Sequence, residues 1–255
     1  MKKQCEALLD EVGTSEQKST YHARLEQMAF LQNRFRTPAE NVDVGQTALA
    51  FAEESGNALL IARGQFHLGF QLLWRGDLKN AEKVLQKAAA LAEALGDAWL
   101  HNQNLTYLII LYRLQGKVDR VAALLPNQEE ISRRLQYDNY IGVNRANSAW
   151  LHYHAGKWMH ARSQAETALA SWSATKYPMQ WLAHWILLAM ALLEERHDDS
   201  ASSALALLDI NQQQLPDEID DALAAAVSAW EAGEETTARA FLETAVELAE
   251  QHGYL

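Results

Sequence analysis

The sequence predicts an all-α protein, a right-handed superhelix of about six helix-turn-helix repeats. Glycine marks the period, because Gly76, Gly116 and Gly156 follow one another at steps of 40 residues. The phrases LAFAEESG at residues 49–56 and AALAEALG at residues 89–96 are closely alike and also lie 40 residues apart. A fixed period of this length is typical of stacked helical units rather than of one closed globule.

Small residues recur around each of these glycines. Within one unit, Gly69, Gly76, Ala81 and Ala88 stand at spacings of seven, five and seven residues. Small side chains at such positions let two antiparallel helices approach closely, and Gly76 supplies the positive φ that ends the first helix. Large apolar residues are expected to fill the seams: Leu68, Leu72 and Leu85 in this unit, Leu108, Tyr112 and Leu125 in the next, and Leu188, Leu192 and Leu205 in a later one. Each unit is therefore a helical hairpin that must stack on a neighbour to bury its apolar face.

The ends of the helices are visible in the sequence. Asp77, Asp97 and Asp138 can accept hydrogen bonds from the free amides at a helix start. Pro38 and Pro216 fit a first helical turn, where a missing N–H costs least. We expect twelve helices in this order: residues 18–35, 38–55, 57–75, 78–95, 97–115, 118–135, 138–155, 158–174, 178–195, 198–212, 216–232 and 235–252.

The pattern of Gly69, Gly76, Ala81 and Ala88 resembles the tetratricopeptide repeat (TPR), in its longer variant of 40 residues. About 34 residues is usual for that repeat, and about 40 is nearer the HEAT and armadillo range, so longer helices would absorb the difference. The tract FQLLWRGDLKNAEKVLQKA at residues 70–88 is similar to repeats in the C-terminal arms of MalT-like bacterial regulators and of multidomain signalling ATPases and cyclases. This resemblance implies a non-enzymatic protein-interaction scaffold, the sensing or partner-binding arm of a larger signalling or transcription regulator.

Composition sets further bounds on the chain. Its 255 residues, 49% of them hydrophobic, are enough for a continuous core. We expect an N-terminal extension over residues 1–17 and a single TPR-like domain over residues 18–255. Cys5 is the only cysteine, which excludes an internal disulfide, and the first residues lack the apolar run of a secretion signal, which favours a cytoplasmic location. The most apolar run, residues 181–193, is too short to cross a bilayer, so we expect no membrane partner.

The formal net charge of −11 is concentrated near one end. Residues 194–250 contain 15 Asp and Glu but only Arg196 and Arg239 as cations. Such an acidic end repels a phosphate backbone, so we expect no direct binding of nucleic acid. Two interpretations stay open, a solvated end cap for the repeat array and an electrostatic dock for a basic partner.

The residue types that carry chemistry do not converge. His152, His154 and His160 form the most metal-like cluster, but on a helix the first two point about 200° apart and the third lies beyond the Gly156 turn. Acidic residues that are adjacent in sequence diverge in the same way. We therefore expect no metal, no cofactor and no catalytic residue.

The concave wall of the expected superhelix supplies the candidate binding site. In TPR-like stacking the first helix of each hairpin lines this wall, and its exposed positions would be Arg63, Phe66, Phe70, Gln103, Thr106, Arg113, Trp150 and Tyr153. An aromatic wall with two arginines suits a protein or peptide partner, and the arginines could bind carboxylates. The alternatives are a small-molecule effector held in this groove, and aromatic side chains that merely fill the seams of long helices.

Overall fold

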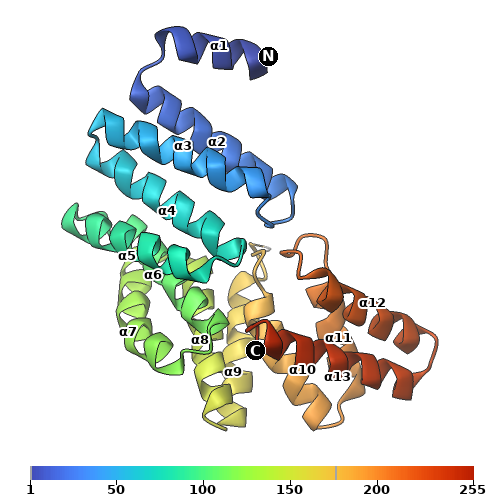
Figure 1. Cartoon of the computed structure of the whole chain (residues 1–255). Helices are drawn as coiled ribbons and strands as arrows, with labels where there is room; N and C mark the ends of the chain where they lie inside the picture. The colour runs from blue at the N-terminus through green and yellow to red at the C-terminus, as the bar shows by residue number, and fades with distance from the viewer. Residues whose placement is uncertain (1, 176) are drawn as a thin grey trace. The chain divides into compact units, whose positions relative to one another are not determined.

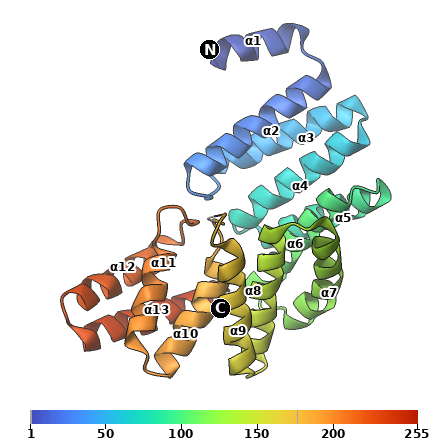
Figure 2. The same cartoon turned by 180° about the vertical axis from the view of Figure 1, so that it is seen from behind.

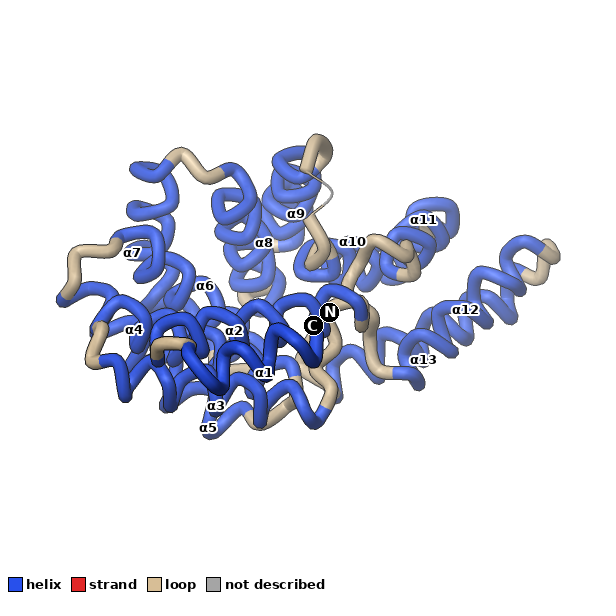
Figure 3. The backbone as a smooth tube through the Cα atoms, turned by 90° about the horizontal axis from the view of Figure 1, so that it is seen from above, coloured by secondary structure: helices blue, strands red, loops and turns tan. Residues whose placement is uncertain are grey.

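The computed structural model describes residues 2–175 and 177–255, apart from the side chains of residues 2, 3, 5 and 39. The described residues form thirteen α-helices and no β-strand (Figure 3). The predicted all-α fold is confirmed. The helices fall into two compact units, Met1–Leu111 and Tyr112–Leu255, and each is described by itself below.

The first unit contains five helices and most of a sixth. Their bounds are α1 (Lys2–Val12), α2 (Ser15–Gln32), α3 (Ala39–Ser55), α4 (Ala58–Trp74), α5 (Leu78–Ala94) and α6 (Ala98–Leu114). Helices α2, α3 and α4 lie side by side, and α4 pairs with α5 (Figures 1 and 2). The sequence analysis missed α1, which packs on α2, because this helix precedes the first repeat and carries none of its small residues.

The second unit continues the chain from the end of α6. Its helices are α7 (Val118–Leu135), α8 (Asp138–His154), α9 (Trp158–Trp172), α10 (Trp181–Leu193), α11 (His197–Leu207), α12 (Asp217–Glu231) and α13 (Glu235–Gln251). Consecutive helices contact each other from α7 to α13, and α10 also touches α8 and α13. Helix α10 is the most apolar and is buried along nearly its whole length. Among the described residues, no helix is both long and apolar enough to span a membrane.

The twelve predicted helices correspond to α2 through α13, and all but one of their ends agree within three residues. The exception is α11, which ends five residues early, at Leu207. The segment after it is held by the connection between α9 and α10: the amide of Gln213 donates to the oxygen of Pro178 at 2.8 Å, and the indole of Trp181 donates to Oε1 of Gln213 at 2.9 Å. These hydrogen bonds come from residues more than 30 positions away, which local sequence signals do not reveal.

The small residues of the repeat have the two roles expected of them. Gly76 has φ +85° and lies in the turn between α4 and α5. Gly69 lies against α5, and a Cβ atom there would be 2.7 Å from Cγ of Leu85. The predicted seam position of Leu205 is wrong, because this side chain is 51% exposed. Helix α11 turns Ala204 and Leu207 inward instead, and Leu205 lies on its opposite side.

Candidate functional site

Three of the predicted binding residues gather around one pocket of the first unit, which we call the Glu26 pocket. Its volume is about 190 Å³. Helices α2, α4 and α6 supply its walls, which consist of Glu26, Gln27, Phe30, Leu31, Phe66, His67, Phe70, Gln71, Gln103 and Tyr107. The first helices of successive hairpins thus contribute together, and Phe66, Phe70 and Gln103 of the expected binding wall are among the lining residues.

Aromatic rings form most of the apolar wall of the Glu26 pocket. The ring of Phe70 lies edge-to-face with Phe30 and with Tyr107, at centroid distances of 4.8 and 4.6 Å. Phe66 is 5.8 Å from Phe70 and 5.7 Å from Tyr107. The contacts of Phe66 are tilted rather than edge-to-face. Each ring of the wall is held by its neighbours, so the wall is formed before any ligand binds.

Glu26 is the unusual member of this pocket. Its side chain is fully buried, and among the residues that the structure describes neither carboxylate oxygen has a hydrogen-bond partner of acceptable geometry. The space around it is tight, since a Cβ atom at Gly45 of α3 would lie 3.2 Å from Oε2 of Glu26. Burial raises the pKa of Glu26 to about 7, and the nearby side chain of Gln71 opposes this shift only in part. Glu26 is therefore protonated in a large share of molecules at neutral pH.

His67 approaches the same carboxyl group, with its Nδ1 atom 3.8 Å from Oε1 of Glu26. Burial is the largest of the causes that lower the pKa of His67 to about 4, and the positive charges of Arg24 and Arg63 contribute to the same shift. The imidazole is consequently neutral at pH 7, and the contact is not an ion pair there. Within the described part of the first unit, Glu26 therefore has no charged partner at pH 7. Its ionised form costs free energy, because a buried charge is normally stabilised by pairing.

The sequence analysis missed Glu26, although a signal for it exists in the repeat. Steps of 40 residues lead from Glu26 to Phe66, Thr106, Ala146 and Ile186. All five side chains are buried, with exposures of 0 to 4%. When a repeat position is buried in the other copies, the glutamate at that position is predicted to be buried too. A fully buried carboxylate is rare unless it is paired.

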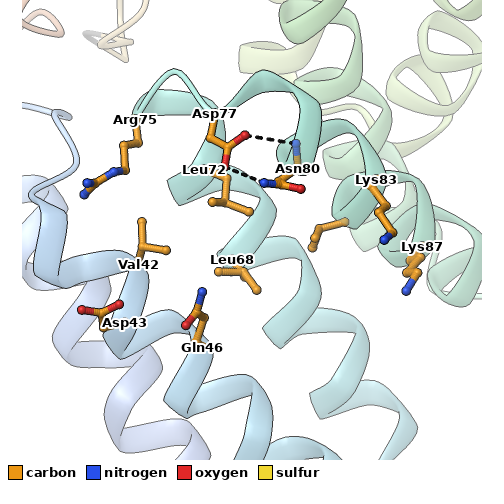
Figure 4. Close-up of a pocket in the computed structure, with 11 residues that line it drawn as sticks. Val42, Asp43, Gln46, Leu68, Leu72, Arg75, Asp77, Asn80, Lys83 and Lys87 are labelled. Carbon is orange, nitrogen blue, oxygen red and sulfur yellow. Dashed lines mark hydrogen bonds between the residues drawn. The ribbon is translucent and has the colours of Figure 1, made fainter.

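A second, more open hollow of the first unit lies over α3, α4 and α5, with a volume of about 540 Å³. Figure 4 shows Leu68 and Leu72 in the middle of the hollow, with Val42, Asp43 and Gln46 of α3 on one side and Arg75, Asp77, Asn80, Lys83 and Lys87 around the rest. Asp77 caps α5, since it accepts hydrogen bonds from the backbone and side-chain amides of Asn80 at 3.3 and 2.7 Å. The cations are exposed and their fields are screened by water, so this hollow is the weaker candidate.

The structure corrects the expected exposure of Arg113 in the second unit. Its side chain is fully buried. The guanidinium donates hydrogen bonds to the backbone oxygens of Ala146, Leu182 and Tyr254 at 3.5, 2.7 and 3.3 Å. Burial lowers the pKa of Arg113 to about 9, so the charge is retained at neutral pH. The group ties three segments together and is not available to a partner's carboxylate.

Trp150 is also buried, against the expectation that it lines an open wall. Its indole donates to the backbone oxygen of Leu255, and Nε2 of His154 lies 3.2 Å from the same oxygen. The rings of Trp181 and Tyr254 meet edge-to-face at 4.7 Å. Residues 253–255 therefore cover this part of the second unit, and the seam-filling interpretation holds for Trp150.

The other predicted residues differ in their surroundings. Thr106 is buried, and its hydroxyl donates to the backbone oxygen of Asn102 at 2.9 Å, while Phe66 is only 4% exposed. Their expected exposure is wrong, because neighbouring helices cover both positions. Arg63 is exposed, as expected. A binding role for these residues stays a prediction.

Tyr153 belongs to a different hollow, in the second unit, of about 350 Å³. Leu192 and Leu193 of α10 form its apolar side, and α13 adds Glu243, Glu247 and Glu250 together with Arg239, which pairs with Glu243 at 2.8 Å. Burial raises the pKa of Tyr153, and the negative charge of Glu250 adds to the shift. This acidic, partly apolar hollow belongs to the end of the chain for which a basic partner was one of the two expectations.

The histidines considered as metal ligands do not converge in the structure. The rings of His152 and His160 are 5.4 Å apart, whereas His154 turns toward Leu255. In the described part of the chain, no three His, Cys, Asp or Glu side chains are placed to hold one metal ion.

Comparison with known proteins does not assign this chain to a family. Models of known protein families do not match the chain, and a search of curated proteins finds no match either. The proposals below therefore depend on the geometry of the two units and on the repeat pattern of the sequence.

Proposed function

We propose that this chain is a non-enzymatic protein-interaction scaffold, the partner-binding arm of a larger bacterial signalling or transcription regulator. The Glu26 pocket is the observation that carries the proposal. Aromatic residues dominate the energetics of protein interfaces when they form pockets that exclude water, and this pocket combines such rings with a polar group at its base. The regulator itself is implied by the resemblance of residues 70–88 to repeats in such proteins.

The size of the pocket favours one side chain of a protein partner as its occupant. Pockets for drug-sized ligands measure about 300–1,000 Å³, whereas the Glu26 pocket measures about 190 Å³. Leu31 at its rim is 53% exposed and offers apolar contact to the rest of a bound segment. A partner would therefore insert one anchor and lay neighbouring residues across α2.

A small-molecule sensor is the second candidate, and the buried carboxyl of Glu26 is the observation that favours it. Ligand pockets use a few well-placed polar groups among apolar walls, as this one does. A sensor would bind a compound small enough to be enclosed, and it would need no contact with the surface around the pocket. The two candidates therefore differ in whether residues outside the pocket touch the ligand.

Site-specific photo-crosslinking tests the scaffold. A photoreactive amino acid is placed at Gln27 or Gln103, at the pocket, and in a control at the exposed Glu93 of α5. We expect both pocket positions, but not position 93, to crosslink to the same protein in cells. Phe70→Ala should weaken that crosslink, because it removes the ring that contacts both Phe30 and Tyr107.

Equal crosslinking from position 93, or a product that persists in Phe70→Ala at the parent level, would contradict the placement of the partner. A crosslink to a compound of low mass would favour the sensor. Circular dichroism of Phe70→Ala shows whether the helices are retained, so that loss of binding is separated from loss of fold.

A further inference from the structure

The chemistry of the Glu26 pocket points to the kind of group that enters it. A fully buried carboxyl group lies among four aromatic rings, and within the described residues its nearest hydrogen-bonding neighbour is the side chain of Gln71, whose geometry is poor. A carboxylate attracts a cation, and the electron-rich faces of aromatic rings do so as well. The carboxylate and the aromatic rings therefore both favour a cation as the occupant.

We propose that the Glu26 pocket binds a primary alkylammonium group, the side chain of a lysine on a protein partner, with the Glu26 carboxylate as its counter-ion. This inference depends on the proposed scaffold function and names the group that the scaffold recognises. Both oxygens of Glu26 are covered in the free protein, so the side chains around them must shift before the ammonium can donate hydrogen bonds to them. The four methylene groups of lysine would then pack against the rings of Phe66, Phe70 and Tyr107.

Because other charges near the pocket are positive, the ionisation state of Glu26 decides whether the pocket attracts or repels a cation. Arg24 and Arg63 are both close enough to His67 to lower its pKa, so positive charge lies near the pocket although neither arginine lines it. Arg24 is already engaged, since its Nη1 atom donates to Oε1 of Gln27 at 2.8 Å. With Glu26 protonated, a cation would meet only these repulsive charges. With Glu26 ionised, it would meet a carboxylate inside a poorly solvated pocket, where the attraction is stronger than in water.

Binding of the ammonium should release a proton from the pocket. Glu26 binds its proton until about pH 7 in the free protein, and a cation beside it favours the ionised form. The carboxyl proton passes to solvent, and the ammonium keeps all of its own. From the surrounding helices, Asn41 and Gly45 of α3, Gln71 and His67 of α4, and Gln103 and Tyr107 of α6 line this region. His67 and Tyr107 are the titratable groups among them, and His67 stays neutral near pH 7.

Calorimetric titration with small probes tests the inference on the full chain. The probes are acetyl-lysine N-methylamide, acetylated on its α-amino group only, and the norleucine analogue, which has the same four-carbon side chain without the ammonium. At about pH 8 we expect the lysine probe to bind at least about tenfold more tightly. Below about pH 7 its association constant should fall by about tenfold per pH unit, and two buffers of different ionisation enthalpy should report release of up to one proton.

Glu26→Gln keeps the shape of the side chain and removes the charge. We expect this variant to bind the two probes equally, while the matched control Glu93→Gln, at an exposed site, keeps the parent's preference. Circular dichroism confirms that both variants are folded. Equal binding of the two probes by the parent, or an unchanged preference in Glu26→Gln, would overturn the inference.

The outcomes separate this inference from the proposed function. If the probes bind equally but crosslinking from Gln103 still finds a protein, the scaffold stands and the ammonium site fails. If butylammonium, tested alongside, binds more tightly than the lysine probe, the cation site stands, but its ligand is a free amine and the proposed protein partner is contradicted.

Discussion

Arg113 donates a hydrogen bond to the backbone oxygen of Tyr254, 141 positions later in the chain, at 3.3 Å. The same guanidinium nitrogen also donates to Leu182 of α10. One buried side chain thus links the end of α6, the start of α10 and the segment after α13.

Arg113→Ala should destabilise the second unit strongly, because it leaves a cavity and unpairs buried backbone oxygens. We expect a loss of about 3 kcal/mol or more in the free energy of unfolding, measured by chemical denaturation. Arg134→Ala, which removes an exposed arginine of α7, should change it by less than about 0.5 kcal/mol. Similar losses in the two variants would show that the buried guanidinium does not stabilise the unit.

Gly253 and Gly233 form a matched pair, since both have φ +77°. A Cβ atom at Gly233 would meet no atom within 4 Å, whereas one at Gly253 would lie 2.1 Å from the backbone oxygen of Leu114. Gly233→Ala should cost about 1–2 kcal/mol from its backbone conformation alone. Gly253→Ala should cost about 2 kcal/mol more, because residues 253–255 must leave and lose their hydrogen bonds. Thermal unfolding and tryptophan emission measure both effects, and equal costs would place residues 253–255 elsewhere.

Glu26→Gln should stabilise the first unit at high pH. The folded protein binds the Glu26 proton more tightly than the unfolded chain does, because the pKa rises from 4.5 to about 7. The parent therefore loses stability as the pH rises from about 4.5 through 7, by about 3 kcal/mol in total. His67, with its pKa lowered to about 4, contributes the opposite slope between about pH 4 and 6.5.

Because His67 is present in both proteins, the difference between Glu26→Gln and the parent isolates Glu26. Denaturant unfolding at several pH values should show this difference grow with pH and level off above about pH 8. A difference that does not vary with pH would mean that Glu26 has an ordinary pKa.

The small residues of the seams give a prediction within a single helix, α9. Ala161 is fully buried, whereas Ala170 is exposed. Ala161→Leu should cost about 1–3 kcal/mol through overpacking, and Ala170→Leu should change the melting temperature little. Equal melting temperatures for the two variants would place the seam on a different face of the helix.

The sequence was informative wherever neighbours along the chain decide the structure. Gly76 predicts a helix end because the turn needs a positive φ, and Gly69 predicts a close approach because Leu85 lies only 16 positions away. The 40-residue period then predicts the same helix ends and close approaches in the other repeats. Of the eight residues expected on one binding wall, Phe66, Phe70 and Gln103 line one pocket, and their binding role stays a prediction.

The sequence misled where distant segments decide burial. Arg113 looks exposed from its own helix, and only residues 182 and 254 show that it is covered. Trp150 is hidden in the same way by Leu255. The sequence analysis missed Glu26, because a single glutamate on a helix is usually exposed to solvent. Its burial can be predicted only by comparing the same position in the other repeats.

The tie from Arg113 to Tyr254 has a consequence for how the second unit unfolds. An array of repeats that touch only their neighbours frays from its ends, and its stability is nearly the sum of its units. In this unit the last residues are held by the first, so the end hairpin cannot detach without also exposing Trp150 and Trp181. Amide hydrogen exchange in α12 and α13 should therefore follow that in α8 and α10, as one cooperative block rather than as a gradient along the chain.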